Sequence, residues 1–241
     1  TWKYLQENNL GSPSYIAGHS LGEFTALVAA NSLTFENALK IVTKRAELMQ
    51  NAVPNNEGGM AAIIGLKDKE VIDICKQEQG EGVLQAVNFN SPGQVVIAGS
   101  KSILEKSLES FKHAGAKRAI LLSVSVPSHC KLMEPASILF SNYLNQVNFD
   151  MPDFPIIQNF NAINYNNIDE IKLALVKQLF NPVKWTQTIQ FLSKKEIDIF
   201  VEAGPGKVLT GLNKRINKKA SHFSVNNEEA INEIFLQLRN D

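Results

Sequence analysis

The pattern Gly-x-Ser-x-Gly at residues 18–22 constrains the fold of this chain more than any other feature. A short apolar run, residues 15–17, precedes it, and residues 24–30 (FTALVAA) suit a buried helix. Strand, sharp turn and helix form the context of a nucleophile elbow, which presents a serine at a helix N-terminus beside free backbone N–H groups. The bare pattern also occurs in ordinary turns, so only its flanking segments favour Ser20 as a nucleophile.

Composition excludes several classes of protein. The chain has 241 residues, enough for one or two domains with a buried core, and its 24 Lys+Arg balance its 24 Asp+Glu. This balance argues against nucleic acid as the main partner. The two cysteines, Cys75 and Cys130, lack metal-binding spacing and are typical of a reduced intracellular protein. With no apolar run of membrane-spanning length and no visible signal peptide, we expect a cytoplasmic protein without a membrane partner.

The first quarter of the chain predicts elements that surround Ser20. Thr34 suits an N-cap at the start of a long amphipathic helix that ends near residue 51. The predicted elements are a helix at 2–10, a strand at 14–18, the elbow helix at 21–30 and this long helix.

The polar, turn-rich segment 54–59 separates this region from a different pattern. Its predicted elements are strand 60–65, helix 67–79, strand 84–88, a turn at 90–93, strand 94–98, helix 101–114 and strand 117–122. The order β-α-β-β-α-β is that of a ferredoxin-like unit, so we predict a small subdomain at 58–125.

The remainder of the chain again alternates helices and strands. Helices are predicted from about 132 to 144, and at 168–179, 185–192, 208–216 and 228–238, with strands at 155–159 and 197–202. Such alternation indicates a mainly parallel, covered sheet. We therefore predict an α/β chain in which a large domain, residues 1–57 and 126–241, carries residues 58–125 as an insertion.

A serine nucleophile needs a base, and the chain has four histidines. His129 stands where the chain re-enters the large domain, at a loop-to-helix junction, and is the best candidate; a capping or surface histidine is the alternative. The side chain of His19 should point away from Ser20, His113 ends an amphipathic helix and should be solvated, and His222 lies in a polar region.

Two charged residues have open roles. Glu202 follows a predicted strand, as the acid of a triad would, but it could equally cap the Gly-Pro-Gly turn after it. Arg45 falls on an otherwise apolar helix face; it is either a surface arginine or a fork for a substrate carboxylate, which a guanidinium binds well.

Several motifs together resemble the malonyl-CoA:acyl-carrier-protein transacylases of fatty acid synthesis, and they span nearly the whole chain. They are GHSLGE at 18–23, an arginine at 45, NSPGQVVIAG at 90–99, PSH at 127–129, QLFNPVKW at 178–185 and EAGPGKVL at 202–209. The resemblance implies a hydrolase-like parallel-sheet domain with an inserted ferredoxin-like subdomain.

The resemblance also implies roles for individual residues. Ser20 would be the acylated nucleophile, His129 its base and Arg45 the site for the malonyl carboxylate. A glutamine carbonyl replaces the triad acid in this family, and Gln178 stands at the matching place. The backbone N–H of Leu21 would be one oxyanion donor. Neither a cofactor nor a metal is implied; the partners would be malonyl-CoA as substrate and acyl carrier protein.

The chain departs from the family pattern at its start. The family opens with a strand and a loop of the Gly-Gln-Gly-Ser-Gln type, whose glutamine supplies a second oxyanion donor, and nothing similar precedes Thr1. Loss of one such donor lowers the rate by on the order of a hundredfold. We therefore expect that the sequence lacks an N-terminal segment.

Three functions follow as hypotheses. The first is an acyl-carrier-protein S-malonyltransferase that works through a malonyl-serine intermediate. The second is a serine hydrolase on a similar elbow, which would release free acid and would not need Arg45. The third is an inactive docking subunit that only holds the carrier protein.

Overall fold

The computed structural model describes residues 1–7, 11–124, 126–225, 229, 231–232 and 234–235. The helices are α1 Trp2–Glu7, α2 Leu21–Ala29, α3 Phe35–Gln50, α4 Asp68–Glu78, α5 Lys101–His113, α6 Glu134–Leu144, α7 Ile168–Gln178, α8 Trp185–Lys194 and α9 Val208–Ile216, and a short 3-10 helix covers Lys131–Met133. The strands are β1 Ile16–Ala17, β2 Gly58–Ile64, β3 Leu84–Ser91, β4 Gln94–Ser100, β5 Arg118–Leu121, β6 Ile156–Ile157, β7 Ile199–Ala203 and β8 Ser221–Val225.

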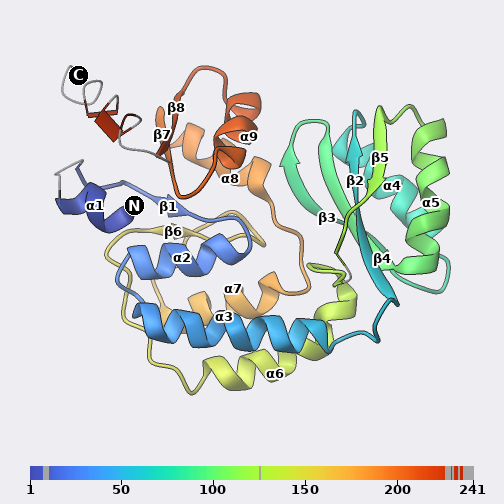
Figure 1. The fold of residues 1–241 in the computed structure, drawn as a ribbon, viewed down its shortest axis with the longest axis horizontal. Coiled ribbons are helices and arrows are strands. Elements are labelled where there is room, and N and C mark those ends of the chain that lie inside the picture. The colour runs from blue at the N-terminus through green and yellow to red at the C-terminus, as the bar shows by residue number, and fades with distance from the viewer. Residues whose placement is uncertain (8–10, 125, 226–228, 230, 233, 236–241) are drawn as a thin grey trace.

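The larger part of the molecule is built on parallel strand pairs. β1 pairs with β6 in the register Ile16 to Ile156, and β7 pairs with β8 in the register Ile199 to Ser221. In Figure 1, α2, α3, α6 and α7 lie on one side of these strands, and α8 and α9 lie near β7 and β8. The α/β prediction is confirmed.

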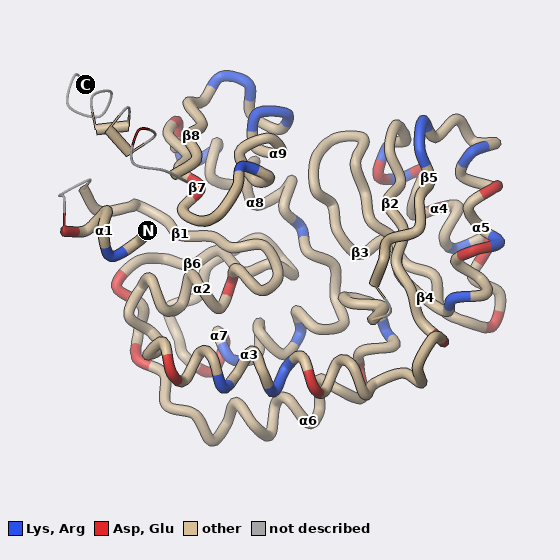
Figure 2. The backbone as a smooth tube through the Cα atoms, in the orientation of Figure 1, with Lys and Arg blue, Asp and Glu red and all other residues tan. Residues whose placement is uncertain are grey.

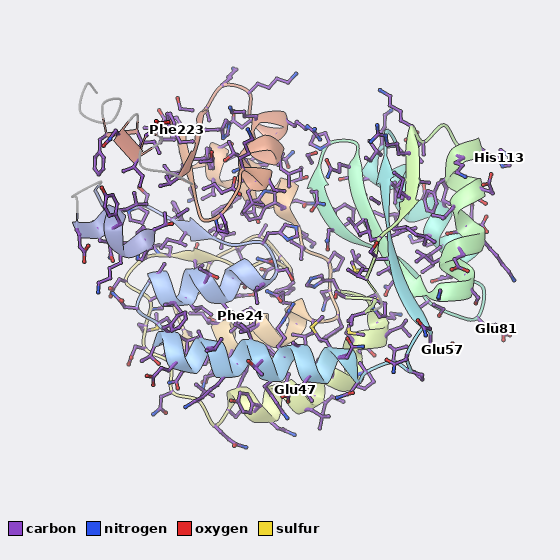
Figure 3. All side chains as sticks on the ribbon, viewed as in Figure 1. Phe24, Glu47, Glu57, Glu81, His113 and Phe223 are labelled. Atoms are coloured by element: carbon purple, nitrogen blue, oxygen red, sulfur yellow. The ribbon has the colours of Figure 1, made fainter. Side chains whose placement is uncertain are left out.

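The helical layer packs around the elbow helix. Thr34 caps α3 as predicted, because its Oγ1 accepts the N–H of Asn37 at 3.1 Å. Phe24 points from α2 toward α3 (Figure 3), and its ring meets that of Phe140 on α6 edge-to-face, with centroids 6.2 Å apart. The nucleophile elbow thus stands on a close-packed apolar layer.

The inserted part has the predicted β-α-β-β-α-β order. Its four-stranded antiparallel sheet has the strand order β3-β4-β2-β5, the arrangement of a ferredoxin-like unit, and α4 and α5 cover one face (Figure 1). The domain boundaries at 58 and 125 remain a prediction.

One edge of the inserted sheet is tied to the larger part. Val183, just before α8, donates its N–H to the carbonyl of Val87 at 2.8 Å and accepts the N–H of Phe89 at 2.9 Å. Arg215 on α9 also donates to Oε1 of Gln94 at 2.8 Å. Strands β3 and β4 are thereby fixed to the segment before α8 and to α9.

Several sequence predictions need correction. The turn predicted at 90–93 is shorter, because β3 continues to Ser91 through two irregularities in its register. The strand β8 was missed, since its sequence SHFSV is half polar and none of its first four side chains is fully buried. The first helix is described over Trp2–Glu7, as predicted for that part; residues 8–10 of its predicted span lie outside those described, as does most of the predicted helix 228–238.

Charges of both signs occur along most of the fold. In Figure 2, basic and acidic segments are mixed along α3 and α5, whereas basic segments gather around α9. Across the described residues, no helix is both long enough and apolar enough to span a membrane.

The core of the inserted part offers a stability test. Leu104 on α5 is fully buried, so Leu104→Ala should lower the free energy of unfolding by about 2–5 kcal/mol. Leu39→Ala, at a position that is 54% exposed on α3, is the matched control and should change it by roughly 0.5 kcal/mol or less. Urea denaturation would measure both, and equal losses would contradict this assignment of the core.

Candidate active site

Ser20 sits in a strained turn between β1 and α2. Its φ of 51° and ψ of −107° are unusual for a residue with a side chain. The turn closes so tightly that a Cβ at Gly18 would lie 1.9 Å from the carbonyl oxygen of Gly22. Asn159, which follows β6, clamps the turn: its Oδ1 accepts the N–H of Ser20 at 2.6 Å, and its Nδ2 donates to the carbonyl of Gly18 at 2.7 Å.

His129, which follows the inserted part in the sequence, lies beside this serine. Its Nε2 lies 2.8 Å from Ser20 Oγ, and its Nδ1 lies 2.6 Å from the backbone carbonyl of Gln178. A carbonyl can only accept, so it fixes the proton on Nδ1 and leaves Nε2 as an acceptor. The site thus presents a serine hydroxyl to a correctly oriented base without a carboxylate behind the histidine.

The base is held neutral. Burial, reinforced by the positive charge of Arg45, lowers the pKa of His129 to about 3. His129 is 3% exposed, and its backbone N–H donates to the carbonyl of Leu179 at 2.9 Å. Its Nε2 is consequently free of a proton, and able to accept one, throughout the physiological pH range.

Arg45 extends from α3 into the same site. Its Nη2 donates to Ser20 Oγ at 3.2 Å and to Oε1 of Gln178 at 2.9 Å. The residue is 8% exposed, and burial lowers its pKa to about 10, so the guanidinium stays charged near neutrality. Within the described part of the chain, its buried Nε has no hydrogen-bond partner.

Leu21 is the first residue of α2, and its backbone N–H stands where a helix has no intrahelical acceptor. The next two N–H groups are already bonded, Gly22 to the carbonyl of His19 and Glu23 to that of Ser20. Leu21 is therefore the candidate donor of this turn for an oxyanion, and this role remains a prediction.

Two functional candidates were missed by sequence reasoning. Glu23 is fully buried, and its Oε2 accepts from Gln178 Nε2 at 2.7 Å and from the backbone N–H of Asn159 at 3.2 Å. The sequence signal that could have revealed Glu23 is a carboxylate in the first turn of an otherwise apolar helix. Asn159 gave a weaker signal, a polar residue directly after a short apolar strand.

The other histidines lie outside this constellation. His19 points away from Ser20, as predicted: its Nε2 lies 2.9 Å from Oδ1 of Asn90 on β3. His113 is exposed on the outer side of α5 (Figure 3). His222 belongs to β8, where its ring stacks on Phe200 with centroids 5.2 Å apart.

Glu202 caps the start of a helix. Its carboxylate accepts the N–H groups of Leu209 and Thr210, at 3.1 and 2.7 Å, at the start of α9. The structure therefore does not bring it to His129, and the turn 204–207 serves the strand-to-helix connection. In the described residues, no group of three or more His, Cys, Asp or Glu side chains is arranged to hold a metal ion.

Comparison with known proteins decides the family. The family model described as "Acyl transferase domain" matches residues 11–228. The chain belongs to the acyl transferase domain family.

Curated members of this family are closely similar. The chain is 46% identical to the malonyl CoA-acyl carrier protein transacylase of Haemophilus influenzae, over 92% of this chain and 71% of that protein. It is 44% identical to the transacylase of the same name from Escherichia coli K12, over 95% and 74%.

Solved structures of acyl transferases agree with the fold. An acyl carrier protein S-malonyltransferase from Vibrio cholerae superposes with a TM-score of 0.94 at 44% identity, covering 97% of this chain and 76% of that one. A malonyl-transacylase in complex with a type II PKS acyl-carrier protein gives 0.95 at 43% identity, covering 100% and 77%. The predicted fold, with its inserted ferredoxin-like subdomain, is confirmed.

The two glycines of the elbow should respond differently to substitution. Gly18→Ala forces a methyl group onto the Gly22 carbonyl and should lower the free energy of unfolding by about 3 kcal/mol or more. Gly22→Ala is the matched control, because a Cβ there meets nothing within 4 Å and should leave stability unchanged or slightly raised. Thermal unfolding would compare them; a stable Gly18→Ala protein would show that the turn is looser than described.

Proposed function

We propose that this acyl transferase moves the malonyl group from malonyl-CoA to the pantetheine thiol of acyl carrier protein, in fatty acid biosynthesis. The observation that carries the proposal is the meeting of three groups from distant segments: Ser20 Oγ, His129 Nε2 at 2.8 Å and Arg45 Nη2 at 3.2 Å. The relatives named as malonyl CoA-acyl carrier protein transacylases support the choice of donor and acceptor.

In the first half-reaction, His129 Nε2 takes the proton of Ser20 while Oγ attacks the thioester carbonyl carbon. The N–H of Leu21 donates to the resulting oxyanion. The intermediate collapses by breaking the carbon–sulfur bond, and the departing CoA sulfur receives the proton from His129. Ser20 is left as a malonyl ester.

In the second half-reaction, the pantetheine thiol of the carrier protein gives its proton to His129 and attacks the ester carbonyl. The carbon–oxygen bond to Ser20 then breaks, and the proton returns to Oγ. The carbonyl of Gln178 holds the imidazole in one tautomer through both halves. The scheme uses no cofactor; malonyl-CoA is a substrate.

Arg45 supplies selectivity in this proposal. A malonyl group on Ser20 carries a free carboxylate, and the guanidinium of Arg45, whose Nη2 lies 3.2 Å from Ser20 Oγ, offers it a buried, charged donor. An acetyl group would leave that donor unsatisfied, which is costly in a buried site. The serine-hydrolase alternative gives Arg45 no task, so its placement favours the transferase.

We place the protein in the cytoplasm, in keeping with two buried, free cysteines.

A direct test is to incubate the protein with malonyl-CoA and measure its intact mass, then add a carrier protein bearing the pantetheine thiol. We expect one malonyl adduct that disappears when the thiol is added, with malonyl-carrier protein as product. Ser20→Ala should form no adduct, because the ester oxygen is absent. Steady release of free malonate without a thiol would indicate a hydrolase, and an unmodified protein would indicate a docking subunit.

The selectivity argument predicts the behaviour of Arg45→Ala. Malonyl transfer should fall by about a hundredfold or more, the loss expected when a buried charged hydrogen bond to substrate is removed, while acetyl transfer is kept or gained. Lys44→Ala is the matched control, since Lys44 lies on the same helix, is exposed and pairs with Glu47. Unchanged malonyl-to-acetyl selectivity in Arg45→Ala would remove Arg45 from the acyl site.

A further inference from the structure

Glu23 is the buried carboxylate of the site that the transfer chemistry leaves unused. It occupies the first turn of α2, three residues after Ser20, and is 0% exposed. Burying a carboxylate is costly unless it is hydrogen-bonded or paired with a charge, so its position calls for an explanation. Both donors to its Oε2, the side chain of Gln178 and the backbone of Asn159, belong to residues that hold the catalytic groups.

The Gln178 amide links Glu23 to Arg45. On one side its Nε2 donates to Glu23 at 2.7 Å and to the carbonyl of Ser20 at 3.0 Å; on the other its Oε1 accepts from Arg45 at 2.9 Å. An ionised carboxylate only accepts and a guanidinium only donates, so this pair permits one orientation of the amide. Arg45 is thereby given an acceptor that directs its Nη2 toward Ser20.

The same arrangement balances one positive and one negative charge inside a closed site. Oε1 of Glu23 and Nε of Arg45 are both buried, and neither has a hydrogen-bond partner among the described residues. Their attraction acts on both groups, since Arg45 favours the ionised form of Glu23 and Glu23 favours the charged form of Arg45. A substrate carboxylate at Arg45 would compete with Glu23 for the same cation.

We propose that Glu23 is a positioning residue that, in either protonation state, directs Arg45 toward Ser20 by accepting a hydrogen bond from the Gln178 amide, and that its ionised form is the counter-charge that a malonyl carboxylate replaces. The proposal rests on the proposed function, because it assumes that Arg45 receives the malonyl group. It adds that malonyl loading and protonation of Glu23 are coupled, since the arriving anion disfavours the ionised carboxylate.

The coupling has a defined sign and pH window. Burial, opposed by the hydrogen bonds from Gln178 and Asn159 and by the charge of Arg45, raises the pKa of Glu23 to about 7. Below this pH Glu23 is neutral and Arg45 is fully available to malonate; above it Glu23 is ionised and competes. Preference for malonyl over acetyl should therefore fall as pH rises through about 7.

The other ionisable groups that face this network would not produce the same change of malonyl-over-acetyl preference with pH. His129, with a pKa of about 3, and Arg45, with a pKa of about 10, do not titrate in this window. Burial lowers the pKa of His19 below its ordinary value, and its protonation would affect both acyl groups. Comparing two thioesters that share the CoA moiety cancels effects common to both.

The experiment measures competition between equal concentrations of malonyl-CoA and acetyl-CoA for Ser20. The ratio of the two initial adducts, read by intact mass, gives the ratio of their kcat/KM values at each pH from about 6 to about 8.5, on either side of the Glu23 pKa. In the wild-type protein we expect this ratio to fall by about tenfold, the effect of roughly one pKa unit of interaction between two buried charges.

Glu23→Gln is the informative variant, since its amide oxygen can still accept from Gln178 and Asn159 while the charge is lost. We expect its ratio to stay near the low-pH wild-type value over the whole range. A merely structural role would instead lower both adduct rates and leave the pH dependence of the ratio in place. Glu47→Gln is the matched control: Glu47 lies on α3 (Figure 3), is exposed and should retain the wild-type profile.

A wild-type ratio that does not change with pH would overturn the proposal even if Glu23→Gln failed to fold. The same pH dependence in Glu23→Gln as in the wild type would also overturn it. Both results are distinct from failure of the proposed function, which would show as absence of a malonyl adduct at every pH and would remove this inference as well.

Discussion

The hydrogen bond between Ser20 Oγ and His129 Nε2 is the interaction on which the site depends, and it joins residues 109 positions apart in the chain. The intervening segment contains the whole inserted sheet, so the bond exists only if the chain returns from that insertion to the elbow. Two hydrogen bonds to backbone carbonyls fix the position of the returning segment: the His129 N–H donates to Leu179, and Nδ1 of the His129 ring donates to Gln178. The end of α7 therefore sets the position of the base, and the elbow sets that of the nucleophile.

The elbow in turn needs a partner outside its own segment. A serine at a φ of 51° is held against its own preference, and the surrounding structure must offset that strain. Asn159 does so with one amide that bonds on both sides of Ser20, to the Gly18 carbonyl and to the Ser20 N–H. Since β6 pairs directly with β1, the parallel sheet is what delivers Asn159 to the turn.

Local signals in the sequence were enough to predict the elbow, the cap at Thr34 and the order of the inserted elements. Each depends on residues within a few positions of one another: the strand, turn and helix around Ser20, the Thr34 hydroxyl with Asn37, and the periodic apolar runs. The resemblance to a family, and not spacing, led to Gln178 and Leu21. What stayed hidden depends on distant partners. The polar strand β8 exists because β7 pairs with it, and Glu23 tolerates burial because Gln178, 155 residues later, bonds to it.

Burying a neutral histidine and a carboxyl group in one site also shapes how the fold responds to pH. His129 has a lowered pKa in the folded state, so its contribution to stability is present above about pH 6.5 and is lost as pH falls toward 3. Glu23 has a raised pKa, so its contribution is present below about 4.5 and is lost as pH rises through about 7. Between pH 4.5 and 6.5, the ordinary pKa values of the two groups, the contributions of Glu23 and His129 to folding stability change with pH in opposite directions and by similar amounts. Across that interval these two groups therefore offset each other's contribution to the pH dependence of folding.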